Sequence, residues 1–299
     1  MQARSLKDWG LLAALIVLWG SNFMFVKLGV ATVPPATLVA SRLAIGAVIL
    51  VAVIRARGLT FPPFGAVWFP YAALAVLGNC LPFWLISWGQ KTIDSALAGI
   101  LMAIMPLTTL VLAHFFVAGE PMTRNRIAGF LIGFGGIVLL MGPAALTGLG
   151  GSAIEVLAQL AVLGGALCYA AQSVLVRLTL KGDVMVASAA IIAIAAVISL
   201  PVALAVDRPW QLTPSWTSVY AVIWIGIGPT AIATLAYLML IGSAGPTFMS
   251  LVNYGVPVVA LLLGVALLGE TPGANAYTGL ALILTGIALS QVRRSRNRL

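Results

Sequence analysis

Amide and aromatic side chains occur near the middle of long apolar segments in this 299-residue sequence. An amide can hydrogen-bond the polar groups of a small molecule, and an aromatic ring can stack on a flat or apolar part of it. The alternative is that these side chains only join neighbouring helices. We take the following as candidate binding residues for a small-molecule substrate: Trp19, Asn22, Asn79, Trp84, Trp88, Tyr169, Gln172, Tyr237 and Asn253.

Arg42 lies about two helical turns inside an apolar segment. Ionisable residues at such positions in membrane proteins commonly serve function, so Arg42 joins the candidate substrate-binding residues. Its guanidinium can attract a substrate carboxylate or line the outer vestibule of a cavity. Alternatively, it snorkels to the surface or binds the carbonyls at a helix end. Lys27 lies nearer a segment end, and we expect it to snorkel.

Proline recurs inside the same apolar segments. A proline frees a backbone carbonyl and loosens the helix around it, which lipid-facing positions tolerate poorly. We therefore predict a central polar cavity with flexible walls, in which four prolines act as gating or hinge residues: Pro82, Pro106, Pro229 and Pro257.

The acidic residues all lie near segment ends: Asp8, Asp94, Glu120, Glu155, Asp183, Asp207 and Glu270. His114 is the single histidine, and no phosphate-binding loop with its lysine occurs. We therefore expect no catalytic residues, no metal site and no cofactor, so the chain is not expected to be an enzyme. Because no carboxylate is available in the middle of a segment as a proton or sodium relay, facilitated diffusion or exchange is the simpler transport mechanism.

The composition indicates the solvent in which these residues lie. The chain is 62% hydrophobic and 8% charged, with a mean hydropathy of +1.11, whereas soluble domains are about 45–50% apolar and about 25% charged. We predict an all-α polytopic membrane protein, since helices of roughly 20 apolar residues cross a bilayer. Ten spans are expected, at 10–31, 36–54, 68–88, 96–117, 127–142, 154–176, 184–206, 217–241, 247–268 and 275–292.

The net charge of +9 predicts the orientation in the membrane. With the N-terminus inside, the outer loops hold only Lys91 and Arg208. The cytoplasmic segments hold Arg4, Lys7, Arg55, Arg57, Arg124, Arg126, Arg177, Lys181, Arg293, Arg294, Arg296 and Arg298. Both termini are therefore expected in the cytoplasm, with the lipid bilayer rather than nucleic acid as the partner of the basic residues.

A shift of 150 residues aligns the two halves of the chain. It places Trp19-Gly20-Ser21-Asn22 on Tyr169-Ala170-Ala171-Gln172 and Gly119-Glu120 on Gly269-Glu270, and small slips pair Pro82 with Pro229 and Pro106 with Pro257. We divide the chain into repeats 1–147 and 148–299. Five helices in each half invert the second copy, and inverted repeats are typical of secondary transporters with a substrate site between the halves.

Several stretches resemble EamA-type carriers of the drug/metabolite transporter superfamily: LWGSNFMFVKLG (18–29), ASRLAIGA (40–47), GEPMTRNRIAG (119–129) and GETPGANAYTG (269–279). The resemblance implies ten helices in two inverted halves, with helices one to four and six to nine around a central cavity and helices five and ten at the periphery. Within the family, the chain is most similar to YddG-like exporters of aromatic and other neutral amino acids. The second half has no counterpart of Arg42, since the equivalent stretch reads MVASAAII (185–192).

These observations predict an exporter of small metabolites, most of all amino acids, in the bacterial inner membrane, working by alternating access. A multidrug exporter, or a carrier of other metabolites such as nucleosides, is the alternative, followed by a membrane scaffold or receptor. The glycines of the fifth and tenth spans suit close helix packing. We expect a monomer or a weak homodimer.

Overall fold

In the computed structural model, residues 5–118, 122–141, 152–180 and 182–291 are described, and these ranges contain helices and no strand. In the first half, the α-helices are α1 (Leu6–Val30), α2 (Pro35–Ala56), α3 (Trp68–Ala75), α4 (Leu81–Gly89), α5 (Ser95–Met102), α6 (Met105–Phe116) and α7 (Arg124–Met141). In the second half, they are α9 (Ala153–Thr179), α10 (Val184–Val206), α11 (Trp216–Ile225), α12 (Ala233–Ala244), α13 (Pro246–Met249), α14 (Val252–Leu268) and α15 (Ala274–Gln291). The all-α prediction is confirmed.

Seven helical segments in the described part of the chain are long and apolar enough to cross a membrane. They are Leu6–Val30, Pro35–Ala56, Trp68–Gly89, Ser95–Phe116, Ala153–Thr179, Val184–Val206 and Trp216–Ala244, and α14 is a shorter apolar helix. Large apolar side chains such as Phe69, Val197 and Leu267 point out of the bundle. An outer surface of this kind suits lipid rather than water.

Two of these segments contain a π-helical stretch, in which each backbone hydrogen bond joins residues five apart rather than four apart as in an α-helix. The first, η1 (Val76–Cys80), joins α3 to α4, and the second, η3 (Gly226–Ile232), joins α11 to α12. The starts of η1 and η3 are 150 residues apart, which is the shift that aligns the two halves of the sequence. A short 3₁₀ turn, η2 (Pro209–Gln211), follows α10.

Carboxylates end or cap several of the helices, as their positions near segment ends suggested. Asp8 forms a capping box with Ser5 at the start of α1, and Asp207 accepts hydrogen bonds from the backbone N–H of Thr37, at 2.6 Å, and from its hydroxyl. Gly269 ends α14 in a left-handed conformation (φ 66°). Gly119, Glu120, Lys181 and the basic residues at 293–298 lie outside the described residues.

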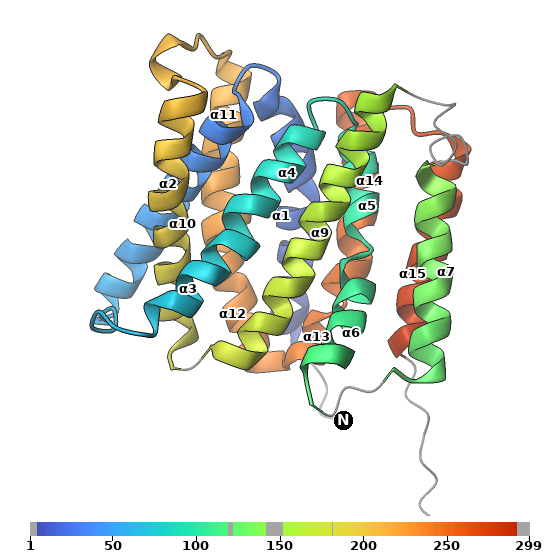
Figure 1. The fold of residues 1–299 in the computed structure, drawn as a ribbon, viewed down its shortest axis with the longest axis horizontal. Coiled ribbons are helices and arrows are strands. Elements are labelled where there is room, and N and C mark those ends of the chain that lie inside the picture. The colour runs from blue at the N-terminus through green and yellow to red at the C-terminus, as the bar shows by residue number, and fades with distance from the viewer. Residues whose placement is uncertain (1–4, 119–121, 142–151, 181, 292–299) are drawn as a thin grey trace, which may run out of the picture.

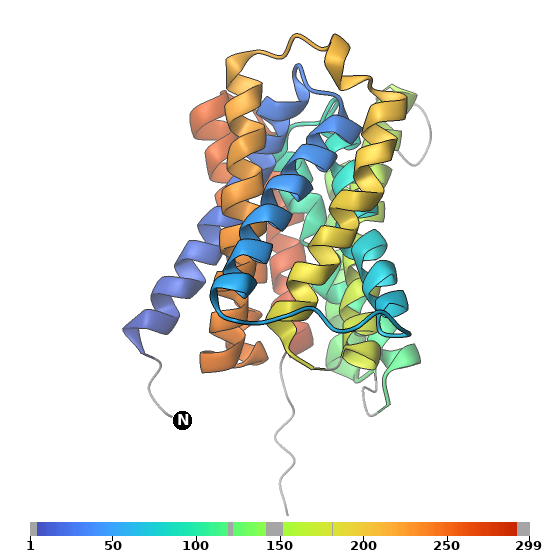
Figure 2. The same cartoon turned by 90° about the vertical axis from the view of Figure 1, so that its left-hand side faces the viewer.

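Helices from the two halves pack against one another throughout the bundle. α1 contacts α14, α11 and α12, α2 contacts α10, and α4 contacts α9. Figures 1 and 2 show α1 beginning and α15 ending at the same end of the bundle.

α7 and α15 form an antiparallel pair at one edge of the bundle (Figure 1). A Cβ atom at Gly129 would collide with the carbonyl of Gly286, and one at Gly136 with the carbonyl of Gly279. Under the 150-residue shift, Gly129 corresponds to Gly279 and Gly136 to Gly286. The two contacts are therefore exchanged by a twofold axis between the helices, as in an isologous interface. The close packing of α7 against α15 within the scaffold therefore depends on Gly129, Gly136, Gly279 and Gly286.

We expect Gly129→Ala to lower the free energy of unfolding by about 1 kcal/mol or more, because the new methyl group must push α15 away. Gly135→Ala on the same helix is the matched control. A Cβ there meets no atom within 4 Å, and alanine is the better helix former, so stability should be unchanged or slightly higher. Unfolding of both variants in mixed micelles measures this, and equal effects would contradict the close contact at Gly129.

Candidate functional site

Arg42 of α2 is buried, with 3% of its surface exposed. Its Nε and Nη2 atoms donate to the Thr230 hydroxyl at 3.3 and 3.1 Å. Arg42 belongs to α2 in the first half, and Thr230 belongs to η3 in the second half. Within the described residues, no carboxylate pairs with this guanidinium, and its acceptor is the neutral hydroxyl of Thr230. Arg42 is therefore neither snorkelling nor capping a helix end.

Thr230 is positioned by the proline before it. Pro229 has no N–H, so the carbonyl of Ile225 lacks its usual donor four residues later. The Thr230 hydroxyl donates to that carbonyl at 2.7 Å and keeps its lone pairs for Arg42. The proline, the π-helical stretch and the bound arginine thus form one local arrangement.

Two aromatic side chains complete the surroundings of Arg42. Its Cζ atom lies 3.7 Å from the centroid of the Phe83 ring, which is close enough for a cation–π contact. The Phe83 ring meets the Tyr169 ring of α9 edge-on, with 6.3 Å between centroids. The site therefore unites α2, α4, α9 and η3.

The other predicted substrate-binding residues are dispersed around this centre. Trp19 and Tyr237 contact each other, with ring centroids 5.9 Å apart. Gln172 packs against Gly78 of η1, next to the buried Asn79. Trp88 is half-buried against a core cluster to which both halves contribute, and Asn253 lies in the first turn of α14. Their roles in substrate binding stay predictions.

Trp84 lies on α4, directly after Phe83, and is 40% exposed. Phe83 is the residue of α4 whose ring contacts the guanidinium of Arg42. A role for Trp84 in lining the cavity stays a prediction.

Three of the four predicted hinge prolines lie in or beside irregular backbone. Pro82 is the second residue of α4, just after η1, Pro229 lies inside η3, and Pro106 is the second residue of α6, just after the break that separates it from α5. Pro257 is instead buried inside α14. The role of the four prolines in gating stays a prediction.

Polar contacts close the end of the bundle that holds the α4–α5 connection. Lys27 donates to the carbonyl of Ile93 at 2.8 Å and lies 3.9 Å from the Asp94 carboxylate. The expected snorkelling of Lys27 is therefore replaced by a contact between α1 and this connection. Gln90 donates through Nε2 to the carbonyl of Phe23 at 2.8 Å.

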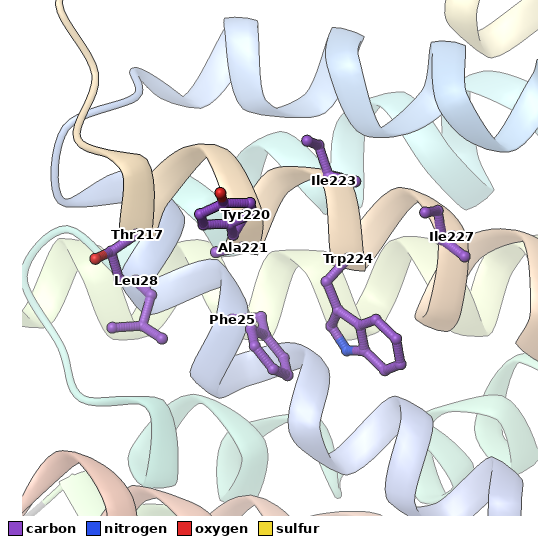
Figure 3. A pocket seen from close by; sticks show the side chains of 8 residues that line it. All are labelled: Phe25, Leu28, Thr217, Tyr220, Ala221, Ile223, Trp224 and Ile227. Atoms are coloured by element: carbon purple, nitrogen blue, oxygen red, sulfur yellow. The ribbon is translucent and has the colours of Figure 1, made fainter.

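Two pockets lie away from Arg42, and no predicted substrate-binding residue lines either of them. The larger is an apolar groove of about 530 Å³ between α1 and α11. Figure 3 shows Phe25 of α1 facing Trp224 of α11 across it. The smaller, of about 240 Å³, is lined by Asp94, Gln159 and Asn275 among others. The described residues contain no cluster of three or more histidine, cysteine or acidic side chains able to hold a metal ion.

The sequence interpretation missed Thr230 and Phe83. A signal for Thr230 was present, because a hydroxyl residue directly after an intramembrane proline can satisfy the carbonyl that the proline frees. No comparable signal marks Phe83, since its contact with Arg42 depends on how α2 and α4 are rotated in the folded bundle.

Comparison with known proteins places this fold among transporters. The model of the EamA-like transporter family matches twice, at residues 8–142 and 156–291. The chain is 28% identical to the uncharacterized inner membrane transporter YedA of Escherichia coli, over 94% of this chain and 89% of the relative. It is 27% identical to the aromatic amino acid exporter YddG of Ancylobacter novellus, over 94% and 96%.

Two further similarities cover nearly the whole chain. A probable terminal-alkyne amino-acid exporter of Streptantibioticus cattleyicolor is 29% identical, over 94% of this chain and 92% of the relative. A solved crystal structure superimposes with a TM-score of 0.69 at 25% identity, over 97% of each chain. The chain belongs to the EamA-like transporter family.

Proposed function

We propose that this transporter exports small metabolites, most of all neutral and aromatic amino acids, across the bacterial inner membrane by alternating access. The observation that carries the proposal is the buried guanidinium of Arg42, which has a neutral hydroxyl but no carboxylate as its partner in the described structure. Burying an unpaired charge is costly. A substrate carboxylate would supply the missing counter-charge in a bidentate geometry.

The surroundings of Arg42 support an amino acid with an apolar or aromatic side chain. The Phe83 ring lies against the guanidinium and the Tyr169 ring packs on Phe83, so an aromatic surface is available beside the cation. The names of two relatives, an aromatic amino acid exporter and a probable terminal-alkyne amino-acid exporter, agree with this substrate class.

The transport cycle that we propose uses ten membrane crossings in two inverted halves with both termini in the cytoplasm. Three observations support it: the common end of the bundle at which α1 begins and α15 ends, the twofold exchange of glycine contacts between α7 and α15, and the matching positions of η1 and η3. Rocking of one half against the other would break the bond between Arg42 and Thr230, because its two residues belong to different halves.

Purified protein in liposomes should release preloaded radiolabelled L-phenylalanine faster than protein-free liposomes do. Nucleosides and cationic drugs, tested in the same way, distinguish the alternative carriers. Because the described residues place no carboxylate in the middle of a membrane-spanning helix, an imposed pH gradient should alter the rate without producing accumulation above equilibrium. If no solute crosses faster than in empty vesicles, the proposal fails, and concentrative uptake driven by the pH gradient would refute uncoupled transport.

A further inference from the structure

Three buried oxygen atoms on α1 and α4 have no hydrogen-bond partner in the described structure: Asn22 Oδ1, Ser87 Oγ and Gln90 Oε1. We call them the acceptor group. A fourth such atom, Gln159 Oε1, belongs to the pocket beside Asp94 and is separate from them. Buried polar atoms in native proteins nearly always have a partner, so three on one pair of helices need an explanation.

The orientation of Gln90 follows from its one hydrogen bond. The residue is fully buried, and its Nε2 donates to the carbonyl of Phe23 on α1. Because a carbonyl can only accept, the amide nitrogen must face it, and Oε1 is left as an acceptor elsewhere. Asn22 directly precedes Phe23, so the same bond holds the two helices together beside the acceptor group.

Ser87, the member of the acceptor group on α4, lies one helical turn along the helix from Phe83, the residue that Arg42 contacts. Phe83, Ser87 and Gln90, the residue that caps the end of α4, follow an i, i+4, i+7 pattern, which places them on one face. Phe83 lies directly under the guanidinium, and four residues of helix span about 6 Å. Ser87, only 1% exposed, is thus the first acceptor beyond the cation.

We infer that the acceptor group binds the ammonium group of a zwitterionic substrate whose carboxylate is held by Arg42. This inference rests on the proposed function. It assigns recognition of the substrate's ammonium group to Ser87, Gln90 and Asn22. An ammonium has three donors and no acceptor, which complements three oxygen acceptors. Lys27 does not compete for them, because its Nζ is bound to the carbonyl of Ile93 and lies near Asp94.

Neutral acceptors suit a carrier that must also return empty. A buried carboxylate would bind the ammonium more strongly, but it would be left as an unpaired charge each time the substrate departs. Neutral oxygens avoid that penalty and select for the amine through hydrogen bonds alone. Substrates that lack the amine would leave these oxygens unpaired, which disfavours their binding.

The test compares L-phenylalanine with 3-phenylpropionate, which keeps the ring and the carboxylate but lacks the ammonium. Flux of both compounds is measured in proteoliposomes for the wild type, Ser87→Ala and Asn22→Ala/Ser87→Ala. Ser290→Ala is the matched control, because Ser290 is buried on α15 and its hydroxyl donates within its own helix. The wild type should prefer L-phenylalanine, and each lost acceptor should reduce this preference about tenfold.

Each outcome separates the inference from the proposed function. If the wild type transports L-phenylalanine and the variants keep its preference, or if they lose both fluxes in proportion, the inference is overturned and the proposed function stands. Replacing Na⁺ by choline tests a cation as the occupant. Flux that requires Na⁺ in the wild type and loses that requirement in Ser87→Ala would also overturn the inference. Absence of wild-type flux for every solute would instead refute the proposed function.

Discussion

Arg42→Gln is expected to lower transport of L-phenylalanine about 10- to 100-fold while leaving the protein folded in the membrane. The guanidinium provides the charged donors for the substrate carboxylate, and hydrogen bonds to charged groups contribute about 1.5–3 kcal/mol each. A glutamine keeps a donor for Thr230 but loses the charge and the bidentate geometry. Arg42→Lys should recover only part of the loss, since an ammonium cannot reproduce the planar contact with Phe83.

The substrate itself supplies the control for this prediction. L-phenylalaninamide keeps the ring and the amine but has no carboxylate, so its flux should fall far less in Arg42→Gln than that of L-phenylalanine. Thr230→Val separates recognition from scaffolding, because it removes the bond to Arg42 while keeping the cation. Equal losses for acid and amide in Arg42→Gln would mean that the arginine acts by joining the two halves rather than by binding a carboxylate.

The sequence predicted the elements of this fold well because the apolar segments are separated by charges, glycines and prolines. Arg42 and the four prolines also stand out in the sequence, because a charge and a missing N–H are conspicuous in any apolar helix, and the structure shows that Arg42 is buried. A charge or a proline of this kind can be recognised within a single segment, without knowledge of the neighbouring helices.

The partners of Arg42 were harder to predict because they depend on helix rotation. The π-helical stretch η1 precedes α4 and widens one turn by a residue. Such a turn changes which side of the following helix faces inward, so periodicity counted through the stretch loses its register. The contact of Phe83, rather than of Trp84 beside it, with Arg42 therefore could not be predicted from the sequence.

Glu270 shows a second relation between the halves that sequence alone did not reveal. Gly269, of the Gly-Glu pair that recurs in both halves of the sequence, ends α14. The carboxylate of Glu270, however, reaches the first half of the chain. It accepts hydrogen bonds from the backbone N–H and the hydroxyl of Ser95 at 2.8 and 2.7 Å, and from the N–H of Ala96 at 2.9 Å. The second half thus caps the start of α5.

Glu270→Gln is therefore expected to lower the free energy of unfolding by about 2–3 kcal/mol. The substitution removes a negative charge from the positive end of α5 and turns an amide N–H toward backbone donors, leaving at least one of them unsatisfied. Glu155→Gln is the matched control, because Glu155 is exposed in the first turn of α9. Glu155→Gln should change the free energy of unfolding by no more than about 0.5 kcal/mol, as ordinary surface substitutions do.

The free energy of unfolding of both variants is measured in mixed micelles. Flux of L-phenylalanine and 3-phenylpropionate then shows whether the lost contact affects substrate binding as well as stability. Glu270 touches α5 and the end of α14 but none of the residues around Arg42, so the preference for L-phenylalanine over 3-phenylpropionate should not change. Equal destabilisation by Glu155→Gln would contradict the cap. A changed substrate preference in Glu270→Gln would connect this contact to the binding site, and the bond between halves would then have to be counted among the determinants of recognition.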